Sequence, residues 1–536
     1  MAQVIFWSAL PNNFALVQRY LGPYQLSSWL EQHDVTTQVI DFTVSGPTKK
    51  VRPETIFRET KKFITKATQC IGISTTFFNS YFGSSIPENL IEAMDLVRQD
   101  YPQIKFVLGG NKAEQYGPEI TKLFDAVVVG LAEDVFLNLI NYWKTGKNEP
   151  KKRRPLNNAG SNFYYNDDVV DKTFDIQTSR HKWRDRDLIM PGEALPLELS
   201  RGCIFKCKFC QYPLLGRSKY DYTRSMDCVR EELVDNYERW GTTTYFVLDD
   251  TMNDTVQKIT EFHAMTQTLP FKIRYGTYLR ADLLHRFPET IPMLKESGLI
   301  GAHFGIETLH TEASKAIGKA WSGKQAKEFL PKLIHEDWND EVSIHCSMIC
   351  GLPGETEQSL IESRDWLIEN RIPSWNFKPL GITRHDQHIF TSEFSKNADQ
   401  YGYTHPRPEE PFYWENTIDG WNWEKAKSFA KVLNRGKRGK DGQMSHVIYD
   451  SWSVVSLLTL GYKYEDLITK PRGQLDRDEL RRRRDIWIKS YHRRLLRWPD
   501  QDESYWREEF DTIFNSGHSG WLDPNKANDD FDDEDL

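Results

Sequence analysis

The chain has 536 residues, 13% of them aromatic, and a formal net charge of −8 at pH 7. A chain of this length predicts two to four domains of roughly 100–200 residues each. The acidic balance gives no general attraction to nucleic acids or anionic membranes. The mean hydropathy is −0.62, and no run approaches the ~20 apolar residues of a membrane span.

Residues 1–145 alternate between short apolar segments and helical patterns. The predicted strands are Val4–Leu10, Thr37–Phe42, Cys70–Thr75, Lys105–Leu108 and Ala126–Val129. Short apolar strands separated by helices predict a parallel, doubly wound α/β sheet, and five strands suit a flavodoxin-like (Rossmann-like) order. Ligands of such sheets bind at the carboxyl ends of the strands, where Gly109, Gly110 and Gly130 lie. Glycines let a backbone approach a ligand closely, although any tight turn can need them.

Residues 195–384 alternate strand and helix again, after a predicted linker at 146–194 that has no apolar period. The predicted strands are Leu197–Ser200, Thr244–Leu248, Lys272–Tyr278, Ile300–Gly305, Val342–Ile349 and Ser374–Leu380. Repeated βα units at this spacing predict a full or partial (β/α)6 barrel of the TIM type. Catalytic groups should then lie at the carboxyl ends of its strands.

Residues 385–527 are rich in Trp and Tyr and predict a mainly α-helical region. Helical stretches are expected near Trp423–Leu433, Tyr449–Leu460 and Asp476–Arg497. The basic runs at 435–440 and 481–484 could bind phosphate or a leader peptide, but such runs are more often solvated surface. The acidic tail at 528–536 is expected to be disordered.

The chain is organised around Cys203, Cys207 and Cys210, which follow a predicted strand with the spacing C-x3-C-x2-C. Three thiolates this close in sequence converge on one point, as the ligands of a metal or cluster do. A structural zinc site needs four ligands, usually as two separated pairs, and neither Cys228 nor His181 stands in a ligand-like spacing. On a [4Fe–4S] cluster, three thiolates leave one iron open for a substrate. A zinc knuckle or buried unpaired cysteines remain the simpler alternatives.

The cysteines also bear on the compartment. Seven cysteines, three of them in one cluster motif, argue against a disulfide framework. The first residues lack a basic segment followed by a long apolar one, so we expect no signal peptide. Both observations predict a cytoplasmic protein, in the reducing environment that an oxygen-sensitive cluster needs.

The cysteine motif, with Phe209 before its third cysteine, resembles the signature of the radical S-adenosylmethionine (SAM) superfamily. The resemblance implies that SAM chelates the open iron and that one electron cleaves SAM to a 5′-deoxyadenosyl radical. It also implies a low-potential electron donor, such as flavodoxin or ferredoxin.

The turns at Gly109-Gly110 and Gly130 resemble those of the cobalamin-binding domain that precedes the core in one large radical SAM subclass. Bound cobalamin is therefore a further implication of the resemblance. The Asp-x-His-x-x-Gly motif, whose histidine ligates cobalt in other corrinoid proteins, is absent. A corrinoid-like fold that serves as a scaffold or docking domain is the alternative.

Two strand ends carry charged residues that resemble SAM-binding positions of the family, Asp249-Asp250 and Arg280. The resemblance implies that one of the two aspartates meets the cationic amino group of SAM. It implies that Arg280 binds the SAM carboxylate or a substrate anion. From the residues alone, Asp250 could instead cap a helix, and Arg280 could pair with Asp282 or Glu307.

Two later strand ends complete the resemblance. Glu307 and Thr308 match a Gly-x-Glu-Ser/Thr element whose polar residues face SAM, and Gly351 and Gly354 match a turn that lies against the adenosine. His303 alternates with Phe304 along its strand, so it could point into the barrel, but a core histidine is the favoured interpretation.

The resulting hypothesis is a radical SAM enzyme that modifies an unactivated carbon of an unknown substrate, which could be a small molecule, a peptide, a lipid or a nucleic acid. With cobalamin the expected outcome is methyl transfer, and without it a rearrangement or cyclisation. A zinc- or cluster-stabilised nucleic-acid-binding protein is the alternative from another class. Analysis of bound zinc and sulfide separates these hypotheses.

Overall fold

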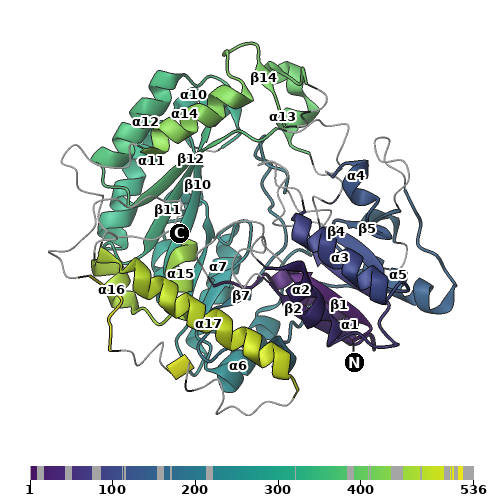
Figure 1. The fold of residues 1–536 in the computed structure, drawn as a ribbon. Coiled ribbons are helices and arrows are strands. Elements are labelled where there is room, and N and C mark those ends of the chain that lie inside the picture. The colour runs from purple at the N-terminus through teal and green to yellow at the C-terminus, as the bar shows by residue number, and fades with distance from the viewer. Residues whose placement is uncertain are drawn as a thin grey trace.

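The computed structural model contains two α/β units that face each other and are bridged by C-terminal helices (Figure 1). It describes residues 2–8, 17–42, 51–74, 86–110, 113, 116–153, 162–169, 172–212, 221–319, 321–382, 391–407, 410, 412–435, 451–470, 474–499, 508, 510–511 and 517–522. The acidic tail at 528–536 lies outside the described residues. No helix in this described part is long and apolar enough to cross a membrane.

The N-terminal unit is a six-stranded parallel sheet with the order β2-β1-β3-β4-β5-β6. Its strands are β1 Val4–Ser8, β2 Thr37–Asp41, β3 Cys70–Ser74, β4 Lys105–Gly110, β5 Ala126–Val129 and β6 Phe163–Tyr165. Its helices are α1 Leu21–Glu31, α2 Pro53–Lys61, α3 Glu88–Asp100, α4 Pro118–Thr121 and α5 Glu133–Thr145. The predicted flavodoxin-like order of the first five strands is confirmed. These strands are recognisable in sequence because helices cover both sheet faces, so that β1 and β5 are buried along their whole length.

The sixth strand comes from the segment in which the sequence predicts a linker. Tyr164 pairs in parallel register with Val128 of β5, and all three residues of β6 are buried. A strand of three residues is too short to show a period, so nothing in the sequence marks it.

The second unit is a parallel sheet with the order β12-β11-β10-β9-β8-β7, and its strands follow one another as in a (β/α)6 barrel. The strands are β7 Leu195–Leu197, β8 Thr244–Val247, β9 Arg274–Leu279, β10 Leu299–Glu307, β11 Ser343–Cys350 and β12 Ser374–Pro379. Among the described residues no ladder joins β12 to β7, so the barrel is partial, as the sequence predicts.

Helices cover the convex face of this sheet (Figure 1). They are α6 Met226–Trp240, α7 Val256–Gln267, α8 Ala281–Arg286, α9 Thr290–Glu296, α10 Thr311–Ala316, α11 Gly323–Pro331 and α12 Glu357–Glu369, and a π-helical segment, Lys332–Asp337, extends α11. Side chains on this face, such as Phe304 and Trp338, which stack at 6.1 Å, form the core between sheet and helices.

The C-terminal region contributes α13 Glu393–Lys396, β13 Tyr403–Thr404, β14 Glu415–Asn416, α14 Trp423–Arg435, α15 Ser451–Thr459, α16 Tyr464–Thr469 and α17 Arg477–Arg497. Helix α15 lies against the concave face of the barrel sheet, where it contacts β8, β9, β10 and β11. Its Trp452 stacks on Phe246 at 3.4 Å and donates a hydrogen bond to the Tyr278 hydroxyl. At its other end, Thr459 accepts a hydrogen bond from Ala194 N, just before β7. Helix α15 therefore packs into the barrel against the concave face of its sheet.

Helix α17 fastens the two units together (Figure 1). Its Tyr491 hydroxyl accepts a hydrogen bond from Asp41 N of β2, and His492 contacts Glu59 of α2 at 2.9 Å. Its Arg494 donates to the carbonyls of Leu188 and Ile189, in the segment that leads to β7. These contacts hold the carboxyl ends of both sheets at a common interface.

Candidate functional site

The three cysteines of the motif lie in the loop that follows β7. The loop is held from both sides, because Lys208 N donates to the Ile317 carbonyl and Lys208 O accepts from Phe394 N. Cys210 N donates to the Cys207 carbonyl at 2.9 Å, and Phe209 packs against the core. The motif therefore forms a compact turn at the carboxyl end of the first barrel strand, as the sequence predicts.

The cysteine side chains are close enough to influence one another. Burial raises the pKa of the Cys203 thiol and raises the pKa of Cys210 to about 12, and in both cases the neighbouring Cys207 adds to the shift. In the described part of the chain, no three His, Cys, Asp or Glu side chains are arranged to hold a single metal ion. Three thiolates that bind three different irons of a cluster stand further apart than the ligands of one metal ion.

The root of the cysteine loop is anchored by a buried ion network. The Asp249 carboxylate accepts hydrogen bonds from Leu199 N at 2.8 Å, Ser200 N at 2.9 Å and Ser200 Oγ at 2.5 Å. The Lys258 ammonium of α7 contacts Asp249 Oδ2 at 3.2 Å and Asp254 Oδ1 at 2.8 Å. Burial alone lowers the pKa of such an ammonium, but these carboxylates outweigh it and raise the pKa of Lys258 above its ordinary value. The Asp249 carboxylate is thus committed to its own chain.

Asp250, the next residue, lies in a different environment. Its side chain faces the cavity described below and can be reached by solvent there, although it lies deep in the protein. Burial, followed by the neighbouring charges of Asp249 and Glu198, raises the pKa of Asp250 to about 7. Of the two aspartates that the resemblance offers for SAM, Asp250 is the one that faces open space.

Arg280 lies between the cluster loop and its own strand end. Its guanidinium forms a two-point ion pair with Asp282, at 3.0 and 2.6 Å, and Nη1 donates to Cys207 Sγ at 3.4 Å. Phe205 covers the guanidinium, with 4.1 Å between the Arg280 carbon Cζ and the ring centre. The pair with Asp282, which the sequence left open, therefore forms, and the remaining cationic edge faces the cysteines.

At the fourth strand end, Glu307 and Thr308 also interact with other residues of the protein. The Lys319 ammonium contacts Glu307 Oε1 at 3.3 Å, and Glu307 is in the left-handed region with φ of 69°. Thr308 Oγ1 accepts from His310 N at 3.0 Å, and a hydrogen bond links its side chain to Glu355. Burial raises the pKa of Glu355 to about 8. These contacts build the turn between β10 and α10.

The two glycines of the fifth strand end are required by packing. A Cβ on Gly351 would lie 2.7 Å from a ring carbon of Trp414, and φ at Gly351 is +93°. Gly354 has φ of +83°, and its N–H donates to Asp419 Oδ2 at 2.9 Å. Both positions therefore bring the C-terminal region onto the barrel rim.

A cavity of about 360 Å³ lies between the carboxyl ends of the two sheets. From the N-terminal unit it is lined by the glycines that the sequence singled out, Gly109, Gly110 and Gly130, and by apolar side chains including Phe6, Leu21, Leu131 and Phe136. From the barrel it is lined by Ser200, Gly202, Tyr212 and Asp250, which flank the cysteine loop. The strand-end glycines and the cysteine loop, about 70–100 residues apart in sequence, therefore share one cavity.

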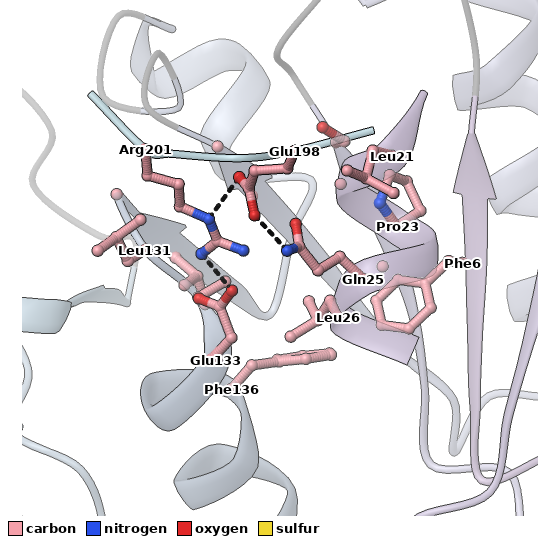
Figure 2. A pocket seen from close by; sticks show the side chains of 18 of the residues that line it. Phe6, Leu21, Pro23, Gln25, Leu26, Leu131, Glu133, Phe136, Glu198 and Arg201 are labelled. Carbon is pink, nitrogen blue, oxygen red and sulfur yellow. Dashed lines mark hydrogen bonds and ion pairs between the residues drawn. The ribbon is translucent and has the colours of Figure 1, made fainter. Parts of the chain in front are cut away.

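A charged network crosses this cavity (Figure 2). Arg201 forms ion pairs with Glu198 at 2.7 Å and with Glu133 at the start of α5, and Gln25 of α1 donates to the other oxygen of Glu198. Burial lowers the pKa of a guanidinium, but here the two carboxylates raise the pKa of Arg201 above its ordinary value. The sequence marks Glu133 only as a residue that opens a helix, because its partner Arg201 is 68 residues away.

A second polar group, which the sequence did not identify as a site, lies inside the barrel. The His303 and His345 rings, on adjacent strands, have centres 4.7 Å apart. His303 Nε2 lies 2.8 Å from Ser347 Oγ, and its Nδ1 has no hydrogen-bond partner in the described part of the protein. His303 therefore lies on the strand face opposite Phe304, as the alternation of these two residues in sequence allows.

The family comparison agrees with this geometry. Residues 197–367, which include the cysteine loop and the strand ends of the barrel, match the family model described as the radical SAM superfamily. This part of the chain is therefore a radical SAM domain, a kind of domain that takes a [4Fe–4S] cluster and SAM.

Curated relatives match only part of the chain. The ribosomal protein uS12 methylthiotransferase RimO of Methylorubrum populi is 25% identical over 198 residues, which cover 34% of this chain and 43% of the relative. RimO of Methylorubrum extorquens is 24% identical over 216 residues, which cover 37% of this chain and 47% of the relative. The chain thus matches less than half the length of these relatives.

Solved structures match nearly the whole fold. The radical SAM methyltransferase TsrM of Kitasatospora setae, with cobalamin and a [4Fe–4S] cluster bound, matches with a TM-score of 0.58 and 14% identity, covering 92% of this chain and 100% of that chain. OxsB, a cobalamin-dependent SAM radical enzyme with aqua-cobalamin and SAM bound, matches with a TM-score of 0.53 and 13% identity, covering 96% of this chain and 75% of that chain. The predicted combination of a cobalamin-binding-like sheet with a radical SAM barrel is confirmed at the level of the fold.

Proposed function

We propose that this radical SAM enzyme binds cobalamin between its two units and transfers a methyl group to an unactivated carbon of its substrate. The cavity that joins Gly109, Gly110 and Gly130 to the cysteine loop is the observation that carries the proposal. Its volume is within the range of about 300–1,000 Å³ found for ligand pockets. Bare glycine backbone and apolar side chains suit a large, flat, partly apolar ligand, and the described residues that line the cavity include no histidine to ligate its metal.

The roles of the residues follow from their positions. Cys203, Cys207 and Cys210 would hold the cluster. The Asp250 carboxylate would accept a hydrogen bond from the amino group of SAM, because it faces the cavity whereas the Asp249 carboxylate does not. When bound, the cluster supplies the electron for reductive cleavage of SAM, and cobalamin supplies the methyl group. Arg280 is proposed as a positioning residue that stabilises the thiolate of Cys207 at 3.4 Å.

Arg201 and its partners have a separate proposed role. The pairs of Arg201 with Glu133 and Glu198 connect the first turn of α5 to the residues that precede Cys203. Because all three side chains are nearly buried, removing one partner would leave an uncompensated charge. We infer that this network fixes the distance between the cobalamin-binding strand ends and the cluster loop.

The substrate and the electron donor belong to the proposal as well. One TsrM structure holds a tryptophan substrate and a SAM analogue, and matches this chain with a TM-score of 0.61 and 14% identity over 91% of this chain. Tryptophan and tryptophan-containing peptides are therefore the first substrates to test. A flavodoxin or ferredoxin is the proposed source of the electron.

The test uses anaerobically purified, cluster-reconstituted protein with SAM and a strong reductant, with and without hydroxocobalamin. Products are followed by mass spectrometry. S-Adenosylhomocysteine that forms only with cobalamin is the expected result. 5′-Deoxyadenosine without any dependence on cobalamin would favour a rearrangement or cyclisation. Bound zinc without sulfide would contradict both and favour the nucleic-acid-binding alternative.

A further inference from the structure

The concave face of the barrel carries a row of polar side chains where barrel interiors are usually filled by branched apolar ones. His303 of β10 pairs in register with Tyr278 of β9 and with His345 of β11, and His345 pairs with Ser374 of β12. One step nearer the carboxyl ends, Ser347 pairs with Asn376. The intervening residues, such as Phe304 and Phe377, point to the opposite face and join the core under the helices. The polar row therefore faces the barrel interior, on the side of α15.

The hydrogen bonds along this row set the orientation of Asn376. Its Oδ1 lies 3.1 Å from His345 Nε2 and accepts from Ser347 Oγ at 3.5 Å. An amide oxygen can only accept, so His345 carries its proton on Nε2, and its Nδ1 accepts from Ser374 Oγ at 2.8 Å. Because Ser347 gives its proton to Asn376, its oxygen accepts from His303 Nε2 at 2.8 Å. The Asn376 oxygen is thus turned toward the wall.

The other end of the amide consequently points away from these hydrogen-bond partners. Nδ2 of Asn376 makes no hydrogen bond within the described chain and is not among the buried polar atoms that lack a partner, so its two N–H groups are solvated. Exposure falls along the wall, from the exposed Lys378 through the half-buried Asn376 and Ser347 to the buried His345. Trp452 of α15 closes the floor next to Tyr278.

His303, behind Asn376, is a neutral support. Burial, followed by the proximity of His345 and of the Lys378 ammonium, lowers the pKa of His303 well below its ordinary value. In this arrangement Nε2 of each ring donates, and Nδ1 of His345 accepts from Ser374 Oγ. Among the described residues, Tyr278, Ser347, Ser374, Asn376 and Lys378 face the pair.

We propose that Asn376 is a substrate-binding residue, which donates its amide N–H to a carbonyl or carboxylate oxygen of the substrate inside the barrel. The inference rests on the proposed function, because it places the substrate on the barrel side of the cluster loop. Ser347 and the two histidines act as positioning residues that hold the Asn376 oxygen inward. The exposed Lys378, two residues along the same face of β12, adds a cationic group beside the same position. The substrate therefore presents an acceptor oxygen to the wall, as part of either a carboxylate or an amide.

The test measures binding of two small probes, acetate and acetamide, to the cluster-loaded enzyme with SAM and without reductant, by ligand-observed NMR titration. Asn376→Leu removes both donors, so we expect each probe to bind about 3- to 10-fold more weakly, the loss of one hydrogen bond. Asn376→Asp keeps the shape but replaces the donors by a carboxylate. It should lose acetate through like-charge repulsion and retain acetamide, which can donate its own N–H.

Matched controls separate binding from folding. Asn141 is an exposed asparagine on α5, so Asn141→Leu and Asn141→Asp apply the same changes at a position without a role. Equal iron content and far-UV circular dichroism show which variants have folded. If Asn376→Leu does not fold, Asn376→Asp still tests the inference, because it should weaken the binding of acetate and retain the binding of acetamide. A carboxylate substrate is indicated if acetate binds the natural enzyme more tightly than acetamide, and an amide if the order is reversed.

Two results overturn the inference: equal probe binding by the natural enzyme and the Asn376 variants, or a loss of SAM affinity in these variants with unchanged probe binding. The outcome is independent of the proposed function, because the titration contains no reductant. An enzyme that forms 5′-deoxyadenosine but shows no difference between the variants refutes only the role of Asn376. An enzyme with an intact cluster that never cleaves SAM refutes the proposed function, whatever the probes show.

Discussion

The Lys258 ammonium lies 3.2 Å from Asp249 Oδ2, and this contact joins the helix after β8 to the root of the cluster loop. The same ammonium donates to Ser200 Oγ at 3.0 Å and to the Thr251 carbonyl at 3.1 Å. Thr251 Oγ1 in turn lies 3.4 Å from Cys203 Sγ. The position of Cys203, the first proposed cluster ligand, therefore depends on the ammonium of Lys258, a residue that is only 3% exposed. Of the described residues that line the cavity, Lys258 contacts Ser200.

Lys258→Met should destabilise the enzyme strongly, because it leaves the carboxylates of Asp249 and Asp254 buried without a counter-charge. We expect a loss of about 3–5 kcal/mol in the free energy of unfolding and a lower iron and sulfide content per chain. Urea denaturation under anaerobic conditions and chemical analysis measure the two effects. Lys324→Met, at an 84% exposed side chain, is the control and should change neither. A Lys258→Met protein with natural stability and full iron content would show that the network does not position the loop.

Cys207→Ala should abolish SAM cleavage, because two remaining thiolates cannot hold a cluster with one open iron. Iron and sulfide content and 5′-deoxyadenosine formation are measured on the same preparation. Cys228→Ala replaces a buried cysteine in the first turn of α6, outside the motif, and should keep both the cluster and the cleavage activity. Unchanged 5′-deoxyadenosine formation by Cys207→Ala would refute the assignment of the cluster ligands.

The fold was largely predictable because its strands are continuous apolar runs separated by helices. The cysteine spacing likewise located the loop after β7. The sequence could not show which of two neighbouring polar residues forms hydrogen bonds within the protein and which faces a cavity. Asp249 and Asp250 look alike in sequence, yet the partners of Asp249 come from 49 residues upstream and 9 residues downstream.

The other residues whose roles were not predicted from the sequence also depend on contacts between distant parts of the chain. Lys258 is one of many lysines on a helical pattern, and a sequence gives no sign that it is buried. His303 and Asn376 meet through strand neighbours and register, which the order of the strands determines but the sequence period does not. The link from Arg201 to Glu133 exists only because the two sheets face each other with their carboxyl ends. Such pairs are unpredictable until the topology is known.

Glu355 predicts a pH dependence of stability. Burial raises the pKa of this carboxyl from its ordinary value of 4.5 to about 8, although hydrogen bonds from Thr308 and from the Leu352 and Gly351 backbone oppose the shift. The folded protein thus retains a proton that the unfolded chain releases near pH 4.5. Glu355 therefore adds stability at low pH, and this contribution is lost as the pH rises toward 8, by at most about 1.4 kcal/mol per pH unit.

Glu355→Gln should remove this dependence, because the amide fills the same space without titrating. Between pH 6 and pH 8.5 we expect the natural enzyme to lose about 1–3 kcal/mol of unfolding free energy relative to the variant. Anaerobic urea denaturation of both proteins at the two pH values gives the difference directly. Parallel pH profiles for the two proteins would show that Glu355 is already ionised in the folded state at pH 6.

Gly109 offers a way to close the cavity without disturbing the sheet. A Cβ built there would meet only the Val128 and Ile73 carbonyl oxygens, at 3.9 and 4.0 Å, whereas Gly110 and Gly130 have φ of 124° and 86° and would be strained by any side chain. Gly109→Val should therefore fold normally and project its side chain into the space proposed for cobalamin. We expect the affinity for hydroxocobalamin to fall at least about tenfold, the equivalent of ~1.4 kcal/mol.

Equilibrium dialysis with visible absorbance measures this affinity on the cluster-loaded protein. Gly109→Ala adds one methyl group and should cause a smaller loss than Gly109→Val, so the pair forms a graded series. The iron content and the unfolding midpoint should be unchanged in both variants, because the cluster loop lies on the opposite wall of the cavity. If both variants bind hydroxocobalamin as tightly as the natural protein, the corrin does not rest on the end of β4, and the cavity serves another ligand.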